Sequence, residues 1–364
     1  MDAAFEYVFP AIRGVQAHRE YYVSMCPLRL IPKLFVFDDE ELLPELRAQR
    51  TLNRSRVPEI AGYILKNPGD YTFSAITASI DANVRFEPIG SGAEGKRVGL
   101  LKVPMSARFI INDGQHRRAA IEIALREKPD FGDESIAVVF FLDIGLERCQ
   151  QMFADLNRHA IRPSKSIGVL YDHRDDLAKV VKLVVLKSSV FQGVVDMERS
   201  TLSPGARKLF TLSALYTATS ELLSKSQYES INDCADRASV FWEEVAKHFP
   251  EWHLVRERKM TAGEVRREFI HSHGIALQAI GRAGSCLIED SPAKWKKRIA
   301  RLKTINWLKS NSKLWEGRAV IGGRVAKTAN NLTLTTNVIK QHLGISLSEE
   351  ETRIDDMCLR GNHA

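Results

Sequence analysis

The sequence predicts an α+β protein, with an N-terminal mixed α/β domain followed by a mainly helical C-terminal domain. Strand-like apolar segments alternate with helical spacing as far as Asp143, whereas strands become scarce from Ser164 onward. The 364 residues are enough for about two or three domains of ordinary size. We therefore divide the chain into residues 1–163 and residues 164–364.

The N-terminal elements follow from apolar periodicity, taken in chain order. Helices are expected from Asp38 or Asp39, from Val57 to Asn67, after Asp113 and over residues 147–157. Pro68 ends the second helix, because the residue before a proline avoids helical geometry. Strands are predicted over residues 5–12, 19–25, 33–37, 71–80, 84–89, 96–103, 107–112 and 136–143, the last one inside a sheet.

A glycine-rich segment at residues 90–95, GSGAEG, matches the GxGxxG pattern of dinucleotide-binding loops. In that fingerprint the loop opens a helix whose N-terminus meets the pyrophosphate. Here the following residues, 96–103, are strand-like. We therefore predict a hairpin loop, and no NAD or flavin site.

Helical spacing dominates the C-terminal domain. Ser291 and Pro292 are expected to begin a basic helix with an apolar stripe, and Thr335 or Thr336 to begin a short helix that Gly344 closes. The stripe consists of Trp295, Ile299, Leu302, Ile305 and Leu308. The other predicted helices cover residues 180–186, 209–223, 235–248 and 262–280.

The most informative local feature is the junction of a strand, residues 113–118 (DGQHRR), and a helix. The first N–H groups of a helix have no partner within the helix and therefore attract anions. A glycine lets a phosphate come close to the main chain, and an arginine can donate two hydrogen bonds to it at once. An acidic residue before the helix could cap it or hold a divalent cation, and the glutamine or histidine could orient a water. An ordinary cap and turn is the alternative. The candidate catalytic residues are Asp113, Gln115, His116 and Arg117, and the candidate phosphate-binding residues are Gly114 and Arg118.

The arginines beside His116 predict a neutral imidazole, since like charge disfavours protonation. A second polar cluster at residues 155–166 contains Asn157 and Arg158, which we assign to cofactor binding, together with Ser164 and Lys165. This cluster could complete the far wall of a phosphate pocket. The alternative is a capped connection between two helices.

The net charge of +7 is concentrated in residues 294–327, which carry eleven basic residues and one acid, Glu316. The rest of the chain carries 41 basic and 44 acidic residues. Such segregation indicates a polyanionic partner and, in a basic helix, duplex DNA; a solvated basic face is the alternative. The candidate DNA-binding residues are Lys294, Lys296, Lys297, Arg298, Arg301, Lys303, Lys309 and Lys313.

The predicted short helix near the C-terminus carries Asn337, Lys340, Gln341 and His342, which could contact base edges. A plain surface helix is the simpler alternative.

Composition excludes several classes of protein. We expect a cytoplasmic protein without a membrane partner, because no apolar run reaches the length of a membrane span and the N-terminus lacks a signal-peptide pattern. The five scattered cysteines predict neither disulfides nor a zinc site, and we assign no metal ligands. Cys26 could sense oxidants, although a lone cysteine is more often buried and inert.

The chain resembles the DndB family of DGQHR-domain proteins, which are associated with bacterial DNA phosphorothioation. The resemblance is carried by residues 73–90, 107–124, 152–175 and 330–344, and the motif Asp113 to Arg117 is unsubstituted. It implies a negative regulator that binds the promoter DNA of the modification operon. It also implies a fold similar to the ParB and sulfiredoxin group, in which the matching turn holds nucleotide phosphates.

Three hypotheses follow. The first is a DNA-binding repressor tuned by ATP or another nucleoside triphosphate, with Mg²⁺ as a candidate companion, at the DGQHR motif. The second is an ATP or GTP hydrolase acting with the phosphorothioation or restriction machinery, since a restriction protein with a similar motif is a nucleotide hydrolase. The third is an interaction subunit in which the motif is a structural turn. Candidate partners are double-stranded DNA, other phosphorothioation proteins and a second copy of the chain.

Overall fold

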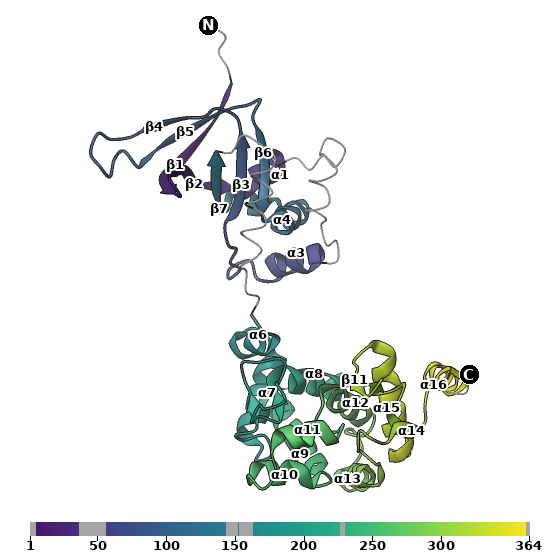
Figure 1. Cartoon of the computed structure of the whole chain (residues 1–364). Coiled ribbons are helices and arrows are strands. Elements are labelled where there is room, and N and C mark those ends of the chain that lie inside the picture. The colour runs from purple at the N-terminus through teal and green to yellow at the C-terminus, as the bar shows by residue number, and fades with distance from the viewer. Residues whose placement is uncertain (1–4, 36–55, 143–151, 153–162, 226–229, 362–364) are drawn as a thin grey trace. The chain divides into compact units, whose positions relative to one another are not determined.

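The computed structural model describes residues 5–35, 56–142, 152, 163–225 and 230–361, with side chains to residue 358. The chain divides into two compact units, Met1–Ile161 and Arg162–Ala364. The α+β class is confirmed, since the strands gather in the first unit and helices dominate the second (Figure 1).

A seven-stranded mixed sheet forms the first unit, in the order β4-β5-β1-β2-β7-β3-β6. Neighbouring strands are antiparallel except β3 and β7, which are parallel. The predicted interior position of the last strand, β7, is confirmed, because β2 and β3 flank it. The strands are β1 Glu6–Gln16, β2 Arg19–Pro27, β3 Ile76–Asp81, β4 Arg85–Pro88, β5 Val98–Pro104, β6 Arg108–Asp113 and β7 Ser135–Leu142.

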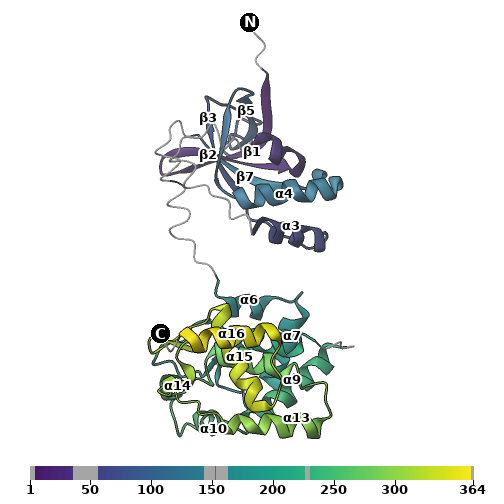
Figure 2. The ribbon, with the colours of Figure 1, turned by 90° about the vertical axis from the view of Figure 1, so that its right-hand side faces the viewer.

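Helices α3 and α4 lie side by side against the sheet (Figures 1 and 2). Their apolar residues Ile64 and Ile121 are fully buried with Val138 and Phe140 of β7. The helix predicted from Val57 is confirmed as α3, which ends just before Asn67 and Pro68. The helices of this unit are η1 Leu28–Leu30, α1 Ile31–Leu34, α3 Arg56–Lys66, α4 Gln115–Glu127 and η2 Pro129–Asp133.

Two N-terminal strand predictions need correction. The strand predicted over residues 33–37 is wrong, because Ile31–Leu34 is a helix with Pro32 in its first turn, and Leu34 and Phe35 are buried by helix packing. The strand predicted from residue 71 begins only at Ile76. The helix predicted from Asp38 or Asp39 and nearly all of that predicted over residues 147–157 lie outside the described residues.

The glycine-rich segment is confirmed as a hairpin loop. It joins the antiparallel strands β4 and β5, and the Gly90 N–H donates to the carbonyl of Gly95 at 3.3 Å. No helix begins there, so the segment lacks the geometry of a dinucleotide loop.

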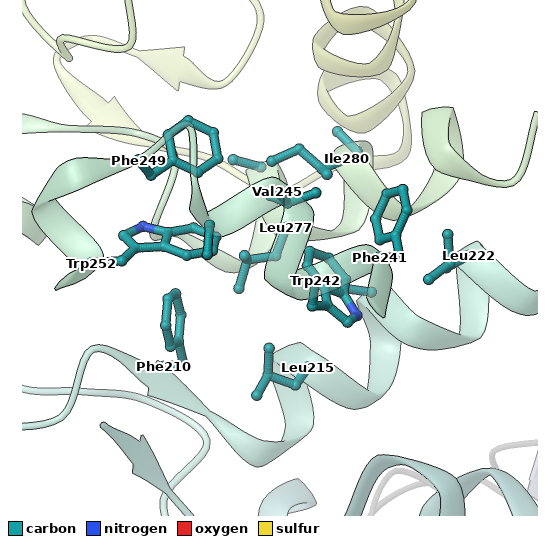
Figure 3. Close-up of a cluster of buried hydrophobic side chains, with 14 of the residues drawn as sticks. Phe210, Leu215, Leu222, Phe241, Trp242, Val245, Phe249, Trp252, Leu277 and Ile280 are labelled. Carbon is teal, nitrogen blue, oxygen red and sulfur yellow. The ribbon is translucent and has the colours of Figure 1, made fainter. Parts of the chain in front are cut away.

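The second unit packs its helices around one apolar core, in which Phe210, Trp242 and Trp252 are among the large buried side chains (Figure 3). Two short ladders, β8 with β9 and β10 with β11, lie between the helices. The helices are α6 Lys165–Tyr171, α7 Asp176–Lys187, α8 Leu212–Leu223, α9 Ile231–Ala246, α10 Pro250–Arg256, α11 Ala262–Glu268, α12 Gly274–Gly284, α13 Pro292–Ile299, η3 Ala300–Thr304, α14 Ser312–Trp315, α15 Ala329–Leu343 and α16 Glu349–Gly361. The short strands are β8 Val195–Asp196, β9 Phe210–Thr211, β10 Val320–Ile321 and β11 Arg324–Val325.

The single helix predicted over residues 262–280 is wrong. The chain leaves helical geometry after Glu268 and resumes it at Gly274. Between them the Ile270 N–H donates to the carbonyl of Trp307 at 2.9 Å, and His271 is buried. This tertiary pairing with residues 307–309 breaks the helix.

The predicted caps of the last helices are partly wrong. α15 begins at Ala329, capped by Thr328, while Thr335 and Thr336 are buried inside the helix and donate to carbonyls four residues earlier. Gly344 does end α15, in the left-handed conformation, as predicted. The basic helix α13 is shorter than expected and continues as η3, so Leu308 lies outside the apolar stripe and is exposed.

Candidate functional site

The predicted strand–loop–helix junction is present: β6 ends at Asp113 and α4 begins at Gln115. Between them Gly114 has φ of 113°, and a Cβ there would lie 3.0 Å from Cγ1 of Ile76. Gly114 itself is the N-cap, without a side-chain cap hydrogen bond, so the alternative of Asp113 as the N-cap is wrong.

The carboxylate of Asp113 instead pairs with Arg117. The Nη2 of Arg117 lies 2.6 Å from Oδ2 of Asp113, and its Nη1 donates to the hydroxyl of Ser74. The Nε of Arg117 is buried and has no hydrogen-bond partner among the described residues. The start of α4 thus holds a positioned guanidinium with one unused donor beside a half-exposed carboxylate.

Two other motif side chains make contacts inside the unit. Gln115 is buried, and its Nε2 donates to the carbonyl of Ile111 at 3.3 Å. Arg118 donates from Nε to the carbonyl of Phe35 at 2.9 Å and from Nη2 to that of Pro32 at 3.2 Å. Arg118 therefore joins α1 to α4. Phosphate or water contacts of Gln115 and Arg118 stay predictions, because any such contact would have to compete with these hydrogen bonds inside the protein.

The expected neutrality of His116 agrees with its environment. Burial lowers its pKa most, the charges of Arg56 and Arg117 lower it further, and Asp113 opposes them. Arg56 begins α3 and supplies the positive charge that we had expected from Arg118. A neutral imidazole can donate and accept hydrogen bonds at once.

Sequence reasoning missed three residues around this turn. Arg56 and Ser74 come from distant parts of the sequence, and no local pattern marks either of them. Asn112 had a visible signal, because it is an amide at the end of an apolar strand. It is fully buried, its Nδ2 donates to Oγ of Ser79 at 2.7 Å, and its Oδ1 has no partner among the described residues.

The second polar cluster is only partly described. Asn157 and Arg158 lie outside the described residues. In the second unit, Ser164 caps α6 by accepting from the N–H of Ile167, and Ser166 is buried, donating to the carbonyl of Arg199 at 2.8 Å. This half of the cluster is a helix start, which agrees with the simpler alternative.

The basic helix has one buried and one charged face. Trp295 and Ile299 are buried, whereas Lys294, Lys297 and Arg301 recur at intervals of three and four residues and are exposed. Within the described part of the chain, no ion pair joins a carboxylate to any member of the set Lys294, Lys297, Arg301, Lys303 and Lys313. We call these five residues the basic surface set.

The other side chains predicted to contact DNA make more contacts within the protein than the basic surface set does. Arg298 donates to the carbonyls of Leu343 and Gly344, at 3.0 and 2.5 Å, and so binds the C-terminal end of α15. The Nζ of Lys296 lies 5.6 Å from the ring centroid of Trp295, and Lys309 is partly buried. Arg298 therefore has a structural contact that the sequence did not indicate.

The helix predicted to contact base edges is not a surface helix. Asn337 is fully buried and donates to the carbonyl of Glu351 at 2.9 Å, and the ammonium of Lys340 pairs with the carboxylate of Glu351. The Nδ1 of His342 lies 2.8 Å from the carbonyl of Val338. α15 packs between α12 and α16, which uses these polar groups internally.

Three further findings concern membrane-spanning helices, metal ligands and the thiol of Cys26. No described helix is long and apolar enough to cross a membrane. Across the same residues, no group of three or more histidine, cysteine, aspartate or glutamate side chains is placed to hold a metal ion. Cys26 is fully buried, and burial raises the pKa of its thiol to about 11, so it is an inert core residue.

Together these features define an α+β protein of two compact units, with a DGQHR turn in one unit and, in the other, a basic helix face that forms no ion pair among the described residues. A family model described as "DndB: DNA-sulfur modification-associated" matches residues 9–346, and the chain belongs to the DndB family. This confirms the family resemblance and links the chain to DNA phosphorothioation systems. No curated protein and no solved structure matches the chain, so the likeness to the ParB and sulfiredoxin group stays a prediction.

Proposed function

We propose that this protein is a DNA-binding negative regulator of a DNA phosphorothioation operon, and that it holds the promoter of its own operon through the basic surface set. The single observation that carries the proposal is this exposed, unpaired positive charge around α13. Lysine and arginine in such an arrangement displace counterions from duplex DNA, which makes binding favourable and strongly salt-dependent. Membership of a family associated with DNA sulfur modification supports the choice of operon.

The proposal includes a nucleotide, ATP or another triphosphate, that tunes DNA binding at the DGQHR turn. The supporting groups are the first N–H groups of α4, the guanidinium of Arg117, whose buried Nε has no partner among the described residues, and the neutral imidazole of His116. Mg²⁺ is a candidate companion ion, since a single carboxylate and substrate phosphates often hold it. The half-exposed carboxylate of Asp113 would bind it, in competition with the ion pair to Arg117. Mg²⁺ would neutralise phosphate charge. Hydrolysis at this turn stays a prediction.

The test is fluorescence anisotropy with a labelled duplex from the upstream region of the operon. In Lys294→Ala/Lys297→Ala/Lys303→Ala, we expect weaker binding and a salt dependence reduced by about two to three units in the log–log slope. The matched control is Lys179→Ala/Lys187→Ala/Lys259→Ala, which removes the same charge from lysines that pair with carboxylates. Equal losses in both variants would contradict the proposal.

Adding ATP and Mg²⁺ to the same assay tests whether a nucleotide changes the affinity for DNA. We expect the nucleotide to change the affinity of the wild-type protein for DNA, and Arg117→Ala to lose that response while still binding the duplex. An unchanged response in Arg117→Ala would reject the DGQHR turn as the site.

A further inference from the structure

The second unit contains a cavity of about 710 Å³ that is separate from the DGQHR turn. Its wall is built from the start of α6, the loop over residues 200–209 with the short strand β9, the beginning of α8, α11, the start of α12, and Lys327 between β11 and α15. The floor includes Phe210, which also belongs to the core cluster (Figure 3). Every part of this cavity lies in one compact unit, so its shape follows from the packing of that unit alone.

The charged side chains that line the cavity are all basic. Lys165, Arg266, Arg267 and Lys327 line the cavity, and none of the described lining residues has a carboxylate. Lys165 and Lys327 form no ion pair within the described residues. Burial lowers the pKa of Lys327, the nearby charge of Lys165 lowers it further, and the charge of Glu221 opposes both. An anion between the two ammonium groups would relieve this repulsion.

Arg266 makes one wall rigid. Its guanidinium donates to the carbonyls of Ser203 and Ala206 at 2.8 and 3.1 Å, and to the carbonyl of Lys208. These carbonyls satisfy its hydrogen bonds, but its partly buried charge has no carboxylate partner among the described residues. The same contacts hold the loop over residues 203–208 against α11 before any ligand arrives.

Ser272 also belongs to the wall and is only 4% exposed. Its hydroxyl oxygen is buried away from the open cavity and has no hydrogen-bond partner among the described residues. A buried hydroxyl without a partner is costly. Ser272 lies two residues before the start of α12, whose first N–H groups add positive potential, and the N-cap residue His273 makes no side-chain cap bond.

From this geometry we infer that the cavity binds a small organic phosphate of nucleotide size, with its phosphate beside Lys165 and Lys327. Leu202, Phe210 and Ala214 supply an apolar surface for the uncharged part of the ligand. The volume lies within the usual range for small-molecule sites, about 300–1,000 Å³. This site is independent of the function proposed above, since it uses neither the DGQHR turn nor the basic surface set.

The test is isothermal titration calorimetry of the full chain with ATP, AMP, adenosine and inorganic phosphate as probes. Arg117→Ala serves as the background, so that binding at the DGQHR turn does not contribute. We expect ATP or AMP to bind better than adenosine, and Lys165→Ala/Lys327→Ala to weaken that binding at least about tenfold. Lys294→Ala/Lys297→Ala removes the same charge from α13 and should change binding less than about twofold.

Ser272→Ala is a control at the cavity wall. Because the hydroxyl has no described protein partner and is buried away from the open cavity, we expect an unchanged or higher melting temperature and ATP binding within about twofold of the Arg117→Ala background. Absence of phosphate-dependent binding, or equal binding by Lys165→Ala/Lys327→Ala, would overturn the inference. It would also be overturned if this double variant lost affinity only for an oligonucleotide, because the lysines would then belong to the DNA surface.

Discussion

Gly114 sits where β6 turns into α4, with φ of 113° and little room for a Cβ. We predict that Gly114→Ala destabilises the first unit by about 1–3 kcal/mol, because alanine must adopt a left-handed conformation against Ile76 and Arg117. Chemical denaturation followed by circular dichroism measures this change.

Gly62→Ala is the matched control for that substitution. Gly62 lies inside α3, and a Cβ there would meet nothing within 4 Å. The control should be neutral or raise stability by about 0.5–1 kcal/mol. If both substitutions had the same effect, the special conformation of Gly114 would not matter for folding.

His271 gives the second unit a pH-dependent stability. Burial lowers its pKa, although Glu251 opposes this from 3.3 Å, and the Trp252 indole N–H donates to its Nδ1 at 2.9 Å. Below the ordinary pKa of about 6.5 the unfolded chain takes up a proton that the folded chain refuses. Its contribution to stability is therefore complete above that pH and is lost as the pH falls.

We expect the free energy of unfolding of the second unit to fall between pH 7.5 and pH 5.5, by at most about 1.4 kcal/mol per pH unit for each such histidine. Burial lowers the pKa of His248 and His273 as well, so they add to the same trend. His271→Asn should reduce the slope of stability against pH. An identical slope in this variant would show that His271 titrates normally.

At the scale of elements, Arg118 connects α1 to α4 through the carbonyls of Pro32 and Phe35. We predict that Arg118→Ala lowers the free energy of unfolding by about 2 kcal/mol, because two carbonyls and Glu122 lose a charged donor. Arg126→Ala is the control. Arg126 also pairs with Glu122 but is 74% exposed, and its loss should cost less than about 0.5 kcal/mol. Equal effects would argue against the structural role of Arg118.

α13 carries two neighbouring basic residues with different roles. Arg298 binds the C-terminal carbonyls of α15, whereas Lys297 is exposed and forms no described ion pair. We predict that Arg298→Ala lowers stability by about 1–3 kcal/mol, and that Lys297→Ala changes it by less than about 0.5 kcal/mol while weakening DNA binding. Thermal unfolding and DNA anisotropy on both variants measure these effects. The reverse pattern would contradict the division of roles.

At the scale of the whole molecule, the described residues form two hydrophobic cores that share no residue. We therefore expect two unfolding transitions in calorimetry, since each unit can bury its apolar surface by itself. Gly114→Ala should shift one transition and His271→Asn the other. A single transition that both substitutions shift equally would indicate coupled folding of the units.

Several elements were predictable because their determinants are local. The strand, glycine and helix around residues 107–124 follow from an apolar run and helical spacing, and the rejection of GSGAEG followed from the strand after it. The predictions over residues 33–37 and 262–280 failed because packing against α4 and pairing with residues 307–309 outweighed local periodicity. Local periodicity is a weak guide where tertiary contacts compete with it.

For the candidate sites, too, some features were predictable from the sequence and others were not. The sequence by itself determined the DndB family and the α+β class, from patterns that run along most of the chain, and the DGQHR turn and the basic segment, from residues that are close together. Only the tertiary structure decided which charges are used inside the protein: Arg118 and Arg298 bind carbonyls of other elements, and Asn337 and Lys340 are buried. It also brought Lys165 and Lys327 together around one cavity. The physical reason is that charge can be counted along the chain, whereas burial and hydrogen-bond partners are set by residues far away in the sequence.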